Sequence, residues 1–501
     1  MKRALALAVL VACGDNQVGP DAPTLVEPIA ECHDVEQTEA DPYLTPESVD
    51  AVSQSPVVPG SLAGWNPDGR WFLTGVRVGG VSSFHFARTG NQVIVDRAPD
   101  DPGTIDNDVL FQRGKLMSGP IEYMVIKRVS NRQPDGSLRA ERIVCDGDNC
   151  RVCTAKLVRA ERNNDEDEGD HLTLVGQLND PAWPAVYTLN VRVDGTTAYL
   201  IRRDGLHIID VADPASPREL GFWGRAMRSG SANDVKIVHY INKTFALIGD
   251  IPVDIVDVTI PTDPQFAGQI AEEAHTLAVE SRDNKTYAYF GNYNAKCPVY
   301  DVTNPAQPTK LGSLGVGNSS LIHDLSVENG IVYLNAWEAG FFVTDYTNPA
   351  SPQMVTHWAP TPAGTSHSSW PTSVDGRHIA LHGDENYNAH LDVIDIDPAS
   401  PKYMTSIGSY QTRDYVSIHN IMAFGSKAYF TYYQDGVRVM DLSNPTHPRL
   451  VGYFNTWDPQ ADYTSSQFYE GAVGIDVDLT RKLVFVADSP RGLLILSDET
   501  P

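Results

Sequence analysis

The feature that most constrains the fold is a short strand motif that recurs along the second part of the chain. Each copy is a run of β-forming residues with an acidic end, followed by a Pro-rich turn such as NPAQP or NPASP. Neighbouring copies end 44 to 50 residues apart, at Asp210, Asp257, Asp301, Asp345, Asp395 and Asp441. A seventh, degenerate copy, LLILS, ends at Ser497. Repeats of this length are typical of β-propellers.

One copy shows what each unit contains. Four runs rich in Val, Tyr and Phe are divided by Gly, Asn and Pro; they are His419–Phe424, Ala428–Tyr432, Val437–Leu442 and Arg449–Phe454. Runs this short predict an antiparallel meander of strands rather than helices. Because one such sheet cannot bury both of its faces, the copies must pack on one another. The sequence therefore predicts an all-β fold with a seven-bladed propeller over residues 171–501.

The last copy lacks an outer strand, because the chain stops at Pro501. Just before the first copy, Leu172–Leu178 reads LTLVGQL and matches the outer-strand pattern LVGYF. We expect this segment to complete the seventh blade, which would close the ring and remove free sheet edges.

The repeats resemble those of the LVIVD-repeat family, through LHIIDV, VDIVDV and RVMDL. The C-terminal part is also similar to the choice-of-anchor B domain of bacterial surface proteins; the strings are HGDENYNAHLDVID, SIHNIMAFG, YYQDGVRVMDLSNP, GYFNT, FYEGAVG and ADSPRGLLIL. The resemblance covers about residues 170 to 501. It implies a secreted or surface-anchored propeller, and it carries no established chemistry.

The start of the chain has the form of a bacterial lipoprotein signal. Basic residues 1–3 precede a short apolar run, and Leu-Val-Ala-Cys ends at Cys13. The apolar run is too short to span a bilayer, so residues 1–12 are predicted as a signal peptide and Cys13 as the lipidated residue. A chance cysteine after an apolar start is the alternative. The predicted location is the cell envelope, as a lipoprotein of the outer membrane or cell surface, with 13–60 as a partly disordered tether.

Charge narrows the class of partner. The chain has 64 acidic and 38 basic side chains and a net charge of −26, which argues against binding to nucleic acid. The expected partner is an unknown protein or glycan ligand of the envelope. We expect contact with a membrane only through the lipid, and a monomer.

A separate small β-domain, a sandwich or a barrel, is predicted over 61–162. Its expected strands are Trp71–Val78, Ser82–Ala87, Gln92–Val95, Glu122–Arg128, Leu138–Cys145 and Arg151–Ala160. Residues 163–170, NNDEDEGD, are predicted as a solvated linker, because this acidic run lacks the ligand spacing of a calcium-binding loop.

Three cysteines lie together in CDGDNCRVC, with Cys32 in the tether and Cys297 in the propeller. The spacing resembles part of a ferredoxin-type ligand run, but the fourth cysteine is missing and the export signal favours disulfides. Cys145–Cys150 is the favoured pair, with Cys32–Cys153 second. Neither connectivity follows from the sequence alone.

Histidines recur where the inner strands of the propeller are expected to begin. The alignment starts these strands at Leu189, Asn233, His275, His323, Trp370, His419 and Ala472. Because all inner strands begin on one face of the disc, imidazoles and carboxylates would meet there, as a divalent transition metal prefers. The candidate ligands are His275, His323, Asp324, His382, Asp384, His390 and His419.

Aromatic and polar residues are expected on the same rim as a ligand-binding surface. They are Trp337, Glu338, Asn420, Tyr432, Tyr433 and Glu470, with Trp337 and Tyr432 as the expected anchors. The six aligned aspartates are assigned to capping the Pro turns on the opposite face.

Three interpretations stay open. In the first, the repeated histidines have a purely structural role and join neighbouring blades. The propeller can be a non-catalytic binding or scaffold module, which the absence of a nucleophile elbow, a zincin helix or a glycosidase carboxylate pair favours. It can also be a metal-dependent propeller enzyme, an oxidase or a hydrolase. No catalytic residue is assigned, and the cofactor stays open between a divalent transition metal and calcium.

Overall fold

A computed structural model describes the chain over residues 30–36, 49, 56–74, 83–96, 101–118, 121–146, 149–224, 233–317, 319–359, 365–386, 391–459, 461 and 469–501. It divides into two compact units. The first extends to Asp165 and includes Arg413–Tyr415 and Asp458–Phe468, and the second holds the remaining residues from Glu166. Within the described residues, no helix has the length and apolar character needed to cross a bilayer.

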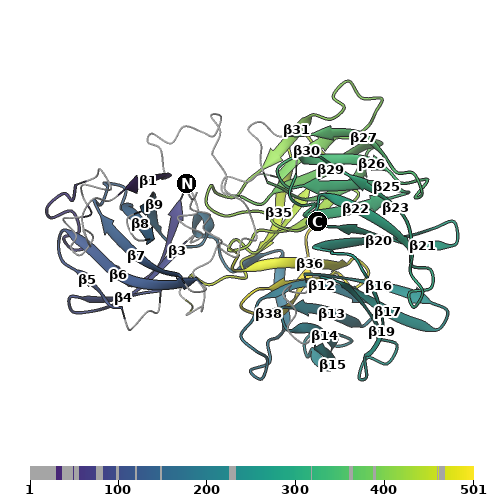
Figure 1. Cartoon of the computed structure of the whole chain (residues 1–501), viewed down its shortest axis with the longest axis horizontal. Coiled ribbons are helices and arrows are strands. Elements are labelled where there is room, and N and C mark those ends of the chain that lie inside the picture. Colours follow the sequence, from purple (N-terminus) through teal and green to yellow (C-terminus); the bar gives the residue numbers. More distant parts are fainter. Residues whose placement is uncertain are drawn as a thin grey trace. The chain divides into compact units, whose positions relative to one another are not determined.

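The first unit is a closed antiparallel barrel, which decides between the two folds expected for it (Figure 1). Its strands are β1 (Ala30–Glu36), β2 (Gly69–Thr74), β3 (Ser83–Thr89), β4 (Gln92–Val95), β5 (Gly103–Ile105), β6 (Val109–Ser118), β7 (Ile121–Ser130), β8 (Leu138–Asp146) and β9 (Asn149–Arg159). Strands β2 to β9 form the ring, which the β8–β9 pairing closes. Strands β5 and β6 were not expected from the sequence.

Strand β1 lies inside the segment predicted as a tether. It pairs with the first part of β9, so that Cys32 faces Cys153 across the ladder. The structure contains the disulfides Cys32–Cys153 and Cys145–Cys150, which are the two pairs the sequence favoured, and among the described residues Cys297 is a free, buried thiol.

The second unit is a seven-bladed propeller, as predicted. Blades one and two are β12 (Thr188–Asp194), β13 (Thr197–Arg202), β14 (Gly205–Asp210) and β15 (Arg218–Gly224), then β16 (Asp234–Tyr240), β17 (Lys243–Gly249), β18 (Val253–Asp257) and β19 (Gln265–Ile270). Blades three and four are β20 (Thr276–Arg282), β21 (Lys285–Gly291), β22 (Lys296–Asp301) and β23 (Thr309–Gly315), then β24 (Asp324–Glu328), β25 (Ile331–Ala336), β26 (Gly340–Asp345) and β27 (Gln353–Trp358).

Blades five and six are β28 (Ser366–Val374), β29 (Arg377–Asp384), β30 (Leu391–Asp395) and β31 (Ser406–Tyr410), then β32 (Ile421–Phe424), β33 (Lys427–Thr431), β34 (Val437–Asp441) and β35 (Arg449–Phe454). Blade seven is β36 (Ala472–Asp478), β37 (Leu483–Asp488) and β38 (Gly492–Asp498), completed by β11 (Leu172–Leu178). Because β11 pairs along β38 from Leu172↔Asp498 to Leu178↔Leu493, the predicted ring closure is confirmed.

The acidic run before β11 was predicted as a solvated linker, and most of its residues are exposed. It contains the 3-10 turn η1 (Asn163–Asp165) and β10 (Gly169–Asp170), which adds a fifth strand to blade six. Glu166 accepts a hydrogen bond of 2.7 Å from Arg438, whose side chain is fully buried. The Glu166 carboxylate supplies a counter-charge to this buried guanidinium.

Two residue types that recur in the repeat, an aspartate and a glycine, have structural roles. Each of the six aligned aspartates accepts a hydrogen bond of 2.7 to 3.1 Å from the backbone N–H two residues further on, which confirms the predicted cap. In four outer strands a glycine packs on the Pro turn of the next blade, where an added Cβ would lie 2.0 to 2.3 Å from a proline carbonyl oxygen; they are Gly176, Gly221, Gly312 and Gly408.

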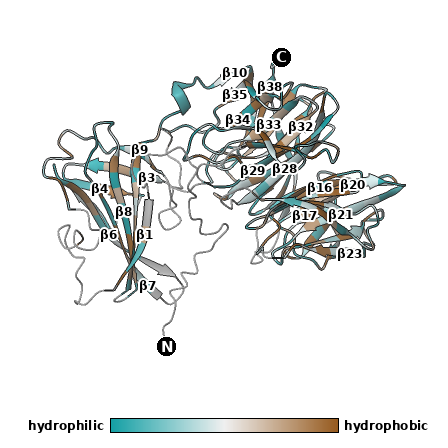
Figure 2. Ribbon diagram, turned by 90° about the horizontal axis from the view of Figure 1, so that it is seen from above, coloured by the Kyte–Doolittle hydropathy of each residue, from teal (hydrophilic) through white to brown (hydrophobic). Residues whose placement is uncertain are grey.

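Apolar side chains between successive blades form the core. At the closure, Val191, Leu200 and Ile209 of blade one are buried against Phe485 and Ile495 of blade seven. Figure 2 shows hydrophobic (brown) segments within the strands of both units. Burial of this kind scales with apolar area, so the last interface stabilises the ring as the others do.

Candidate functional site

Four histidines from four consecutive blades form an arc where the inner strands begin. His275 and His323 directly precede β20 and β24, His367 lies in β28, and His419 lies two residues before β32. Along the series the ring centroids are 4.2, 4.1 and 4.3 Å apart. We refer to these four residues as the histidine arc.

His367 was missed by the sequence analysis, which started the inner strand of blade five at Trp370. Strand β28 begins at Ser366 and carries a β-bulge, because Ser366 pairs with Asp384 and Ser368 pairs with Gly383. A bulge leaves one residue out of the ladder and redirects its side chain. The one sequence signal was the spacing from Asp345 to Asp395, the longest between regular copies, which leaves room for a longer first strand.

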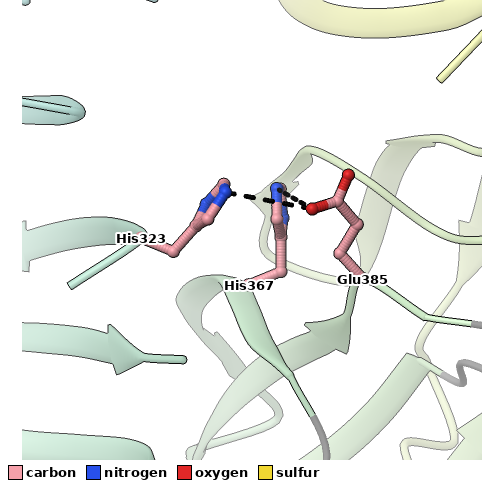
Figure 3. Close-up of side chains that lie close together, drawn as sticks. All are labelled: His323, His367 and Glu385. Carbon is pink, nitrogen blue, oxygen red and sulfur yellow. Dashed lines mark ion pairs between the residues drawn. The ribbon is translucent and has the colours of Figure 1, made fainter. Parts of the chain in front are cut away.

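Glu385, the first residue after β29, lies beside the arc. Its Oε2 lies 3.9 Å from His323 Nε2 and 3.8 Å from His367 Nε2, and the three ligand atoms lie within 4.8 Å of one another. Figure 3 shows the three side chains converging. All three are buried, with 6%, 1% and 2% exposure for His323, His367 and Glu385.

Several polar atoms of this cluster lack partners. Among the described residues, Nδ1 of His323 and both ring nitrogens of His367 are buried without a hydrogen bond. Leaving a buried polar group unpaired costs about 1–3 kcal/mol. Of these nitrogens, His367 Nε2 faces the Glu385 carboxylate, so a cation held by the two imidazoles and the carboxylate would give it a partner.

Tyr433 positions the carboxylate of Glu385. Its hydroxyl donates a hydrogen bond to Glu385 Oε1, and Thr365 fixes the backbone by accepting from Glu385 N–H at 3.0 Å and donating to its carbonyl at 2.9 Å. Tyr433 has a φ of 36°, and a Cβ on Gly471 would lie 2.2 Å from its carbonyl oxygen. A non-glycine residue kept in the left-handed region is often found at functional sites.

Burial keeps the arc neutral. It lowers the pKa of all four histidines, that of His275 to about 4 and those of His323 and His367 well below the ordinary value of 6.5. For His419, the negative charge of Glu385 opposes this lowering of the pKa. Neutral imidazole is the form that binds a metal ion.

The two ends of the arc have different hydrogen bonds. His419 Nδ1 lies 2.8 Å from the carbonyl oxygen of Val473, which places a proton on Nδ1 and leaves Nε2 as a lone pair. His275 Nδ1 lies 2.8 Å from the hydroxyl of Tyr293 and 3.3 Å from the amide nitrogen of Asn233, and its Nε2 lies 3.1 Å from His323 Nε2.

The structure does not bring Asp324, His382 or Asp384 into the cluster. Asp324 is beside Lys236 and Asp234, and burial with the charge of Asp234 raises its pKa to about 6. His382 shares a hydrogen bond of 2.8 Å with Ser366 Oγ and packs against the rings of Phe341 and Trp358. Burial, with the charge of Asp392, raises the pKa of Asp384 to about 7. His390 and Cys13 lie outside the described residues.

The predicted rim is largely internal. Trp337 and Tyr432 are 2% and 0% exposed, which corrects the expectation that their rings are surface anchors. Trp337 instead stacks on His323, with ring centroids 4.8 Å apart. Glu338 accepts hydrogen bonds from Ser319 and Ser320, Glu470 accepts one of 3.2 Å from the Trp457 indole, and Asn420 N–H donates to Thr431 Oγ1 at 2.9 Å.

Comparison with known proteins identifies the repeat. Residues 187–223 and 419–456 match the LVIVD repeat family. Together with the seven blades, these matches support placing the propeller among LVIVD-repeat propellers. No curated protein matches the chain.

Similar solved structures include the computationally designed Ika8 protein, at 11% identity over 76% of this chain and 94% of that one, with a TM-score of 0.41. The WD40 β-propeller domain of Doa1 is 12% identical over 65% of this chain and 96% of its own, with a TM-score of 0.44. Chaetomium thermophilum Raptor is 11% identical over 65% of this chain, which spans 28% of Raptor, with a TM-score of 0.47.

Proposed function

We propose that this LVIVD-repeat propeller is a binding module that takes up a divalent transition-metal ion between His323, His367 and Glu385. The observation that carries the proposal is the convergence of three buried ligand atoms within 4.8 Å, one of which, His367 Nε2, has no hydrogen-bond partner. Imidazole with carboxylate suits zinc, copper, iron or nickel, whereas calcium prefers a shell of oxygens. Of the two cofactors left open by the sequence, the donor set favours the transition metal.

Titration calorimetry tests this proposal. Full-length protein without a His tag, freed of metal with a chelator, is titrated with Zn²⁺ and Co²⁺, and one ion per chain is expected. Glu385→Gln and His367→Gln each replace a metal ligand by a side chain of similar size. Each is expected to weaken metal binding by at least about a hundredfold. His447→Ala, which removes an exposed histidine of a Pro turn, is the matched control and is expected to bind like the parent.

Tyr433→Phe removes only the hydroxyl that positions Glu385. The loss of such a supporting contact typically weakens metal binding about 10- to 100-fold. The proposal is wrong if the parent binds no ion, or if Glu385→Gln and His447→Ala bind equally well. Circular-dichroism melts of each variant separate loss of ligand from loss of fold.

We further propose that the protein is a cell-envelope lipoprotein anchored through Cys13, with a protein or glycan of the envelope as its macromolecular partner. The Leu-Val-Ala-Cys motif supports this, as do two disulfides, since disulfides persist in oxidising compartments. Mass spectrometry of protein extracted from its own host should find diacylglycerol on Cys13. A product that retains Met1, or that is cleaved elsewhere without lipid, would contradict the anchor.

A metal-dependent enzyme is the second candidate function. It needs a coordination position that the protein leaves open to another ligand. The cluster has three protein ligands, so the state of that position decides between simple retention of the ion and chemistry on it.

A further inference from the structure

We infer that the loaded metal centre binds a small anion in its open coordination position, with His275 as the hydrogen-bond donor to that anion. This inference rests on the proposed metal-binding function and names the class of ligand that the centre would take: a small carboxylate or another monoanion of similar size.

The first argument is the number of ligands. His323, His367 and Glu385 give one ligand atom each. Transition-metal ions such as zinc are at least four-coordinate, and sites with three protein ligands bind water or an external ligand in the fourth position. The loaded centre therefore has at least one position for a molecule from solution.

The second argument is charge. A divalent ion brings two positive charges, and the three-residue group returns one negative charge, from Glu385. Imidazole binds a metal ion in its neutral form, so the two histidines add no charge. A net positive charge left in a buried site costs several kcal/mol unless a counter-charge accompanies it. An anion in the open position supplies that charge directly on the metal.

Two aspartates of the inner strands are engaged elsewhere. Asp234 is buried and pairs with the Lys236 amine, and it accepts a hydrogen bond of 2.8 Å from Asn190. Asp476 accepts a hydrogen bond of 2.7 Å from the backbone N–H of Val193. These carboxylates help join the blades, so they do not act as counter-ions for the centre.

The third argument places the anion on the His275 side. The side-chain amide nitrogen of Asn233 is only a donor, so its contact with His275 Nδ1 assigns the ring proton of His275 to Nε2. In the ion-free arrangement this N–H points at His323 Nε2, 3.1 Å away. When His323 gives that lone pair to the metal, the N–H of His275 loses its acceptor and becomes available to the metal's external ligand.

The other end of the arc does not suit an anion. Because His419 donates Nδ1–H to Val473, its Nε2 presents a lone pair, which repels negative charge. Tyr293, which is in contact with the His275 ring, is 42% exposed, so this end of the arc adjoins a solvent-exposed side chain. Trp337 stacks on the His323 ring, and the rings of the arc are only 4.1 to 4.3 Å apart, so a ligand bound among them would have to be small.

Visible spectroscopy of the cobalt-loaded, full-length protein tests the inference. Four-coordinate Co²⁺ absorbs strongly in the visible range, and its bands shift when an anion replaces water. The parent is titrated with sodium azide and with sodium acetate, against sodium perchlorate at equal ionic strength. We expect a saturable change with azide and acetate, fitting one anion per cobalt, and none with perchlorate.

Variants of His275 supply the control for the donor. His275→Phe should keep one cobalt per chain and weaken azide at least about tenfold, because a hydrogen bond to a charged group is lost. His275→Gln retains an N–H donor and should restore most of the affinity. A role of His275 in folding alone would not produce this difference between two variants that both bind cobalt.

The outcomes separate the two proposals. If the parent binds one cobalt but its spectrum ignores azide and acetate, the centre is closed and the anion inference is wrong, while metal binding stands. If azide binds equally to the parent and to His275→Phe, the assigned donor is wrong. If the parent binds no cobalt, the metal-binding proposal fails and the anion inference fails with it.

Discussion

Gly312→Ala offers a sharp test of how the blades pack. Gly312 lies in outer strand β23 of blade three, and an added Cβ would be 2.2 Å from the carbonyl oxygen of Pro349 in blade four and 3.3 Å from Pro352 Cδ. An ordinary contact begins at 3.4 Å, so strand and turn must separate by about 1.2 Å. The turn resists this movement, because Asn348 accepts hydrogen bonds from Ala350 and Ser351.

The expected cost follows from two opposing effects. Overpacking of a tight interface costs about 1–3 kcal/mol. Replacing glycine by alanine in an allowed conformation returns about 0.4–1 kcal/mol, through lower entropy of the unfolded chain. Gly268 in β19 is a matched control, because it also lies in an outer strand and an added Cβ there meets nothing within 4 Å. Both variants receive the same gain from the unfolded chain, so Gly312→Ala should be less stable than Gly268→Ala by the overpacking cost alone, about 1–3 kcal/mol.

Scanning calorimetry of the full-length protein measures the difference. For a unit of this size, with an unfolding entropy of about 2.1 cal/mol/K per residue, the two variants should melt roughly 1–4 °C apart. Gly176→Ala, Gly221→Ala and Gly408→Ala should resemble Gly312→Ala, because each would meet a proline carbonyl in the same way. Equal melting of Gly312→Ala and Gly268→Ala would refute the packing argument.

Three further predictions concern closure, pH and the barrel. Deleting residues 171–178 removes the strand that pairs with β38, so the propeller should melt at a clearly lower temperature than the parent; unchanged melting would contradict the closure. Burial lowers the pKa of His382 to about 3 and that of His275 to about 4, so the unfolded chain binds more protons than the folded one below about pH 6.5. Urea denaturation should therefore show the free energy of unfolding falling from about pH 6 toward about pH 4. His382→Gln should flatten this pH dependence, and an equal slope in the variant and the parent would contradict the assignment. Replacing Cys32 and Cys153 by serine opens a link between residues 121 apart in sequence, and should destabilise the barrel by about 2–5 kcal/mol; a melting temperature equal to that of the oxidised parent would show that β1 is held by its backbone pairing alone.

The propeller was predictable because its information is local and repeated. A strand pattern of period two and an aspartate that caps the next turn act over a few residues, and each copy repeats them. Leu172–Leu178 could be assigned to blade seven because it has the outer-strand pattern and blade seven lacks one. In the first unit the same approach missed β5 and β6, since short or irregular strands without a repeat have no second copy for comparison.

The candidate site was predictable only in part. His275, His323 and His419 were found because they share a register within the repeat, and the propeller does bring their rings together. Asp324 and His382 share that region of the sequence, yet they hydrogen-bond or ion-pair elsewhere, because neighbouring side chains on a strand point to opposite faces. The burial of Trp337 and Tyr432 depends on the adjoining blades, which no single repeat encodes.

The sequence by itself determined the number of blades, the order in which they follow one another, the strand that closes the ring, and three of the four histidines of the arc. Tertiary structure decided which of these groups can act together. A bulge in β28 turns His367 inward, and the end of β29 places Glu385 beside it while Asp384 lies apart. The physical reason is that a ligand cluster depends on side-chain directions and on distances between blades. Both are set by register shifts and packing among residues far apart in sequence, whereas the blades themselves follow from patterns within each copy.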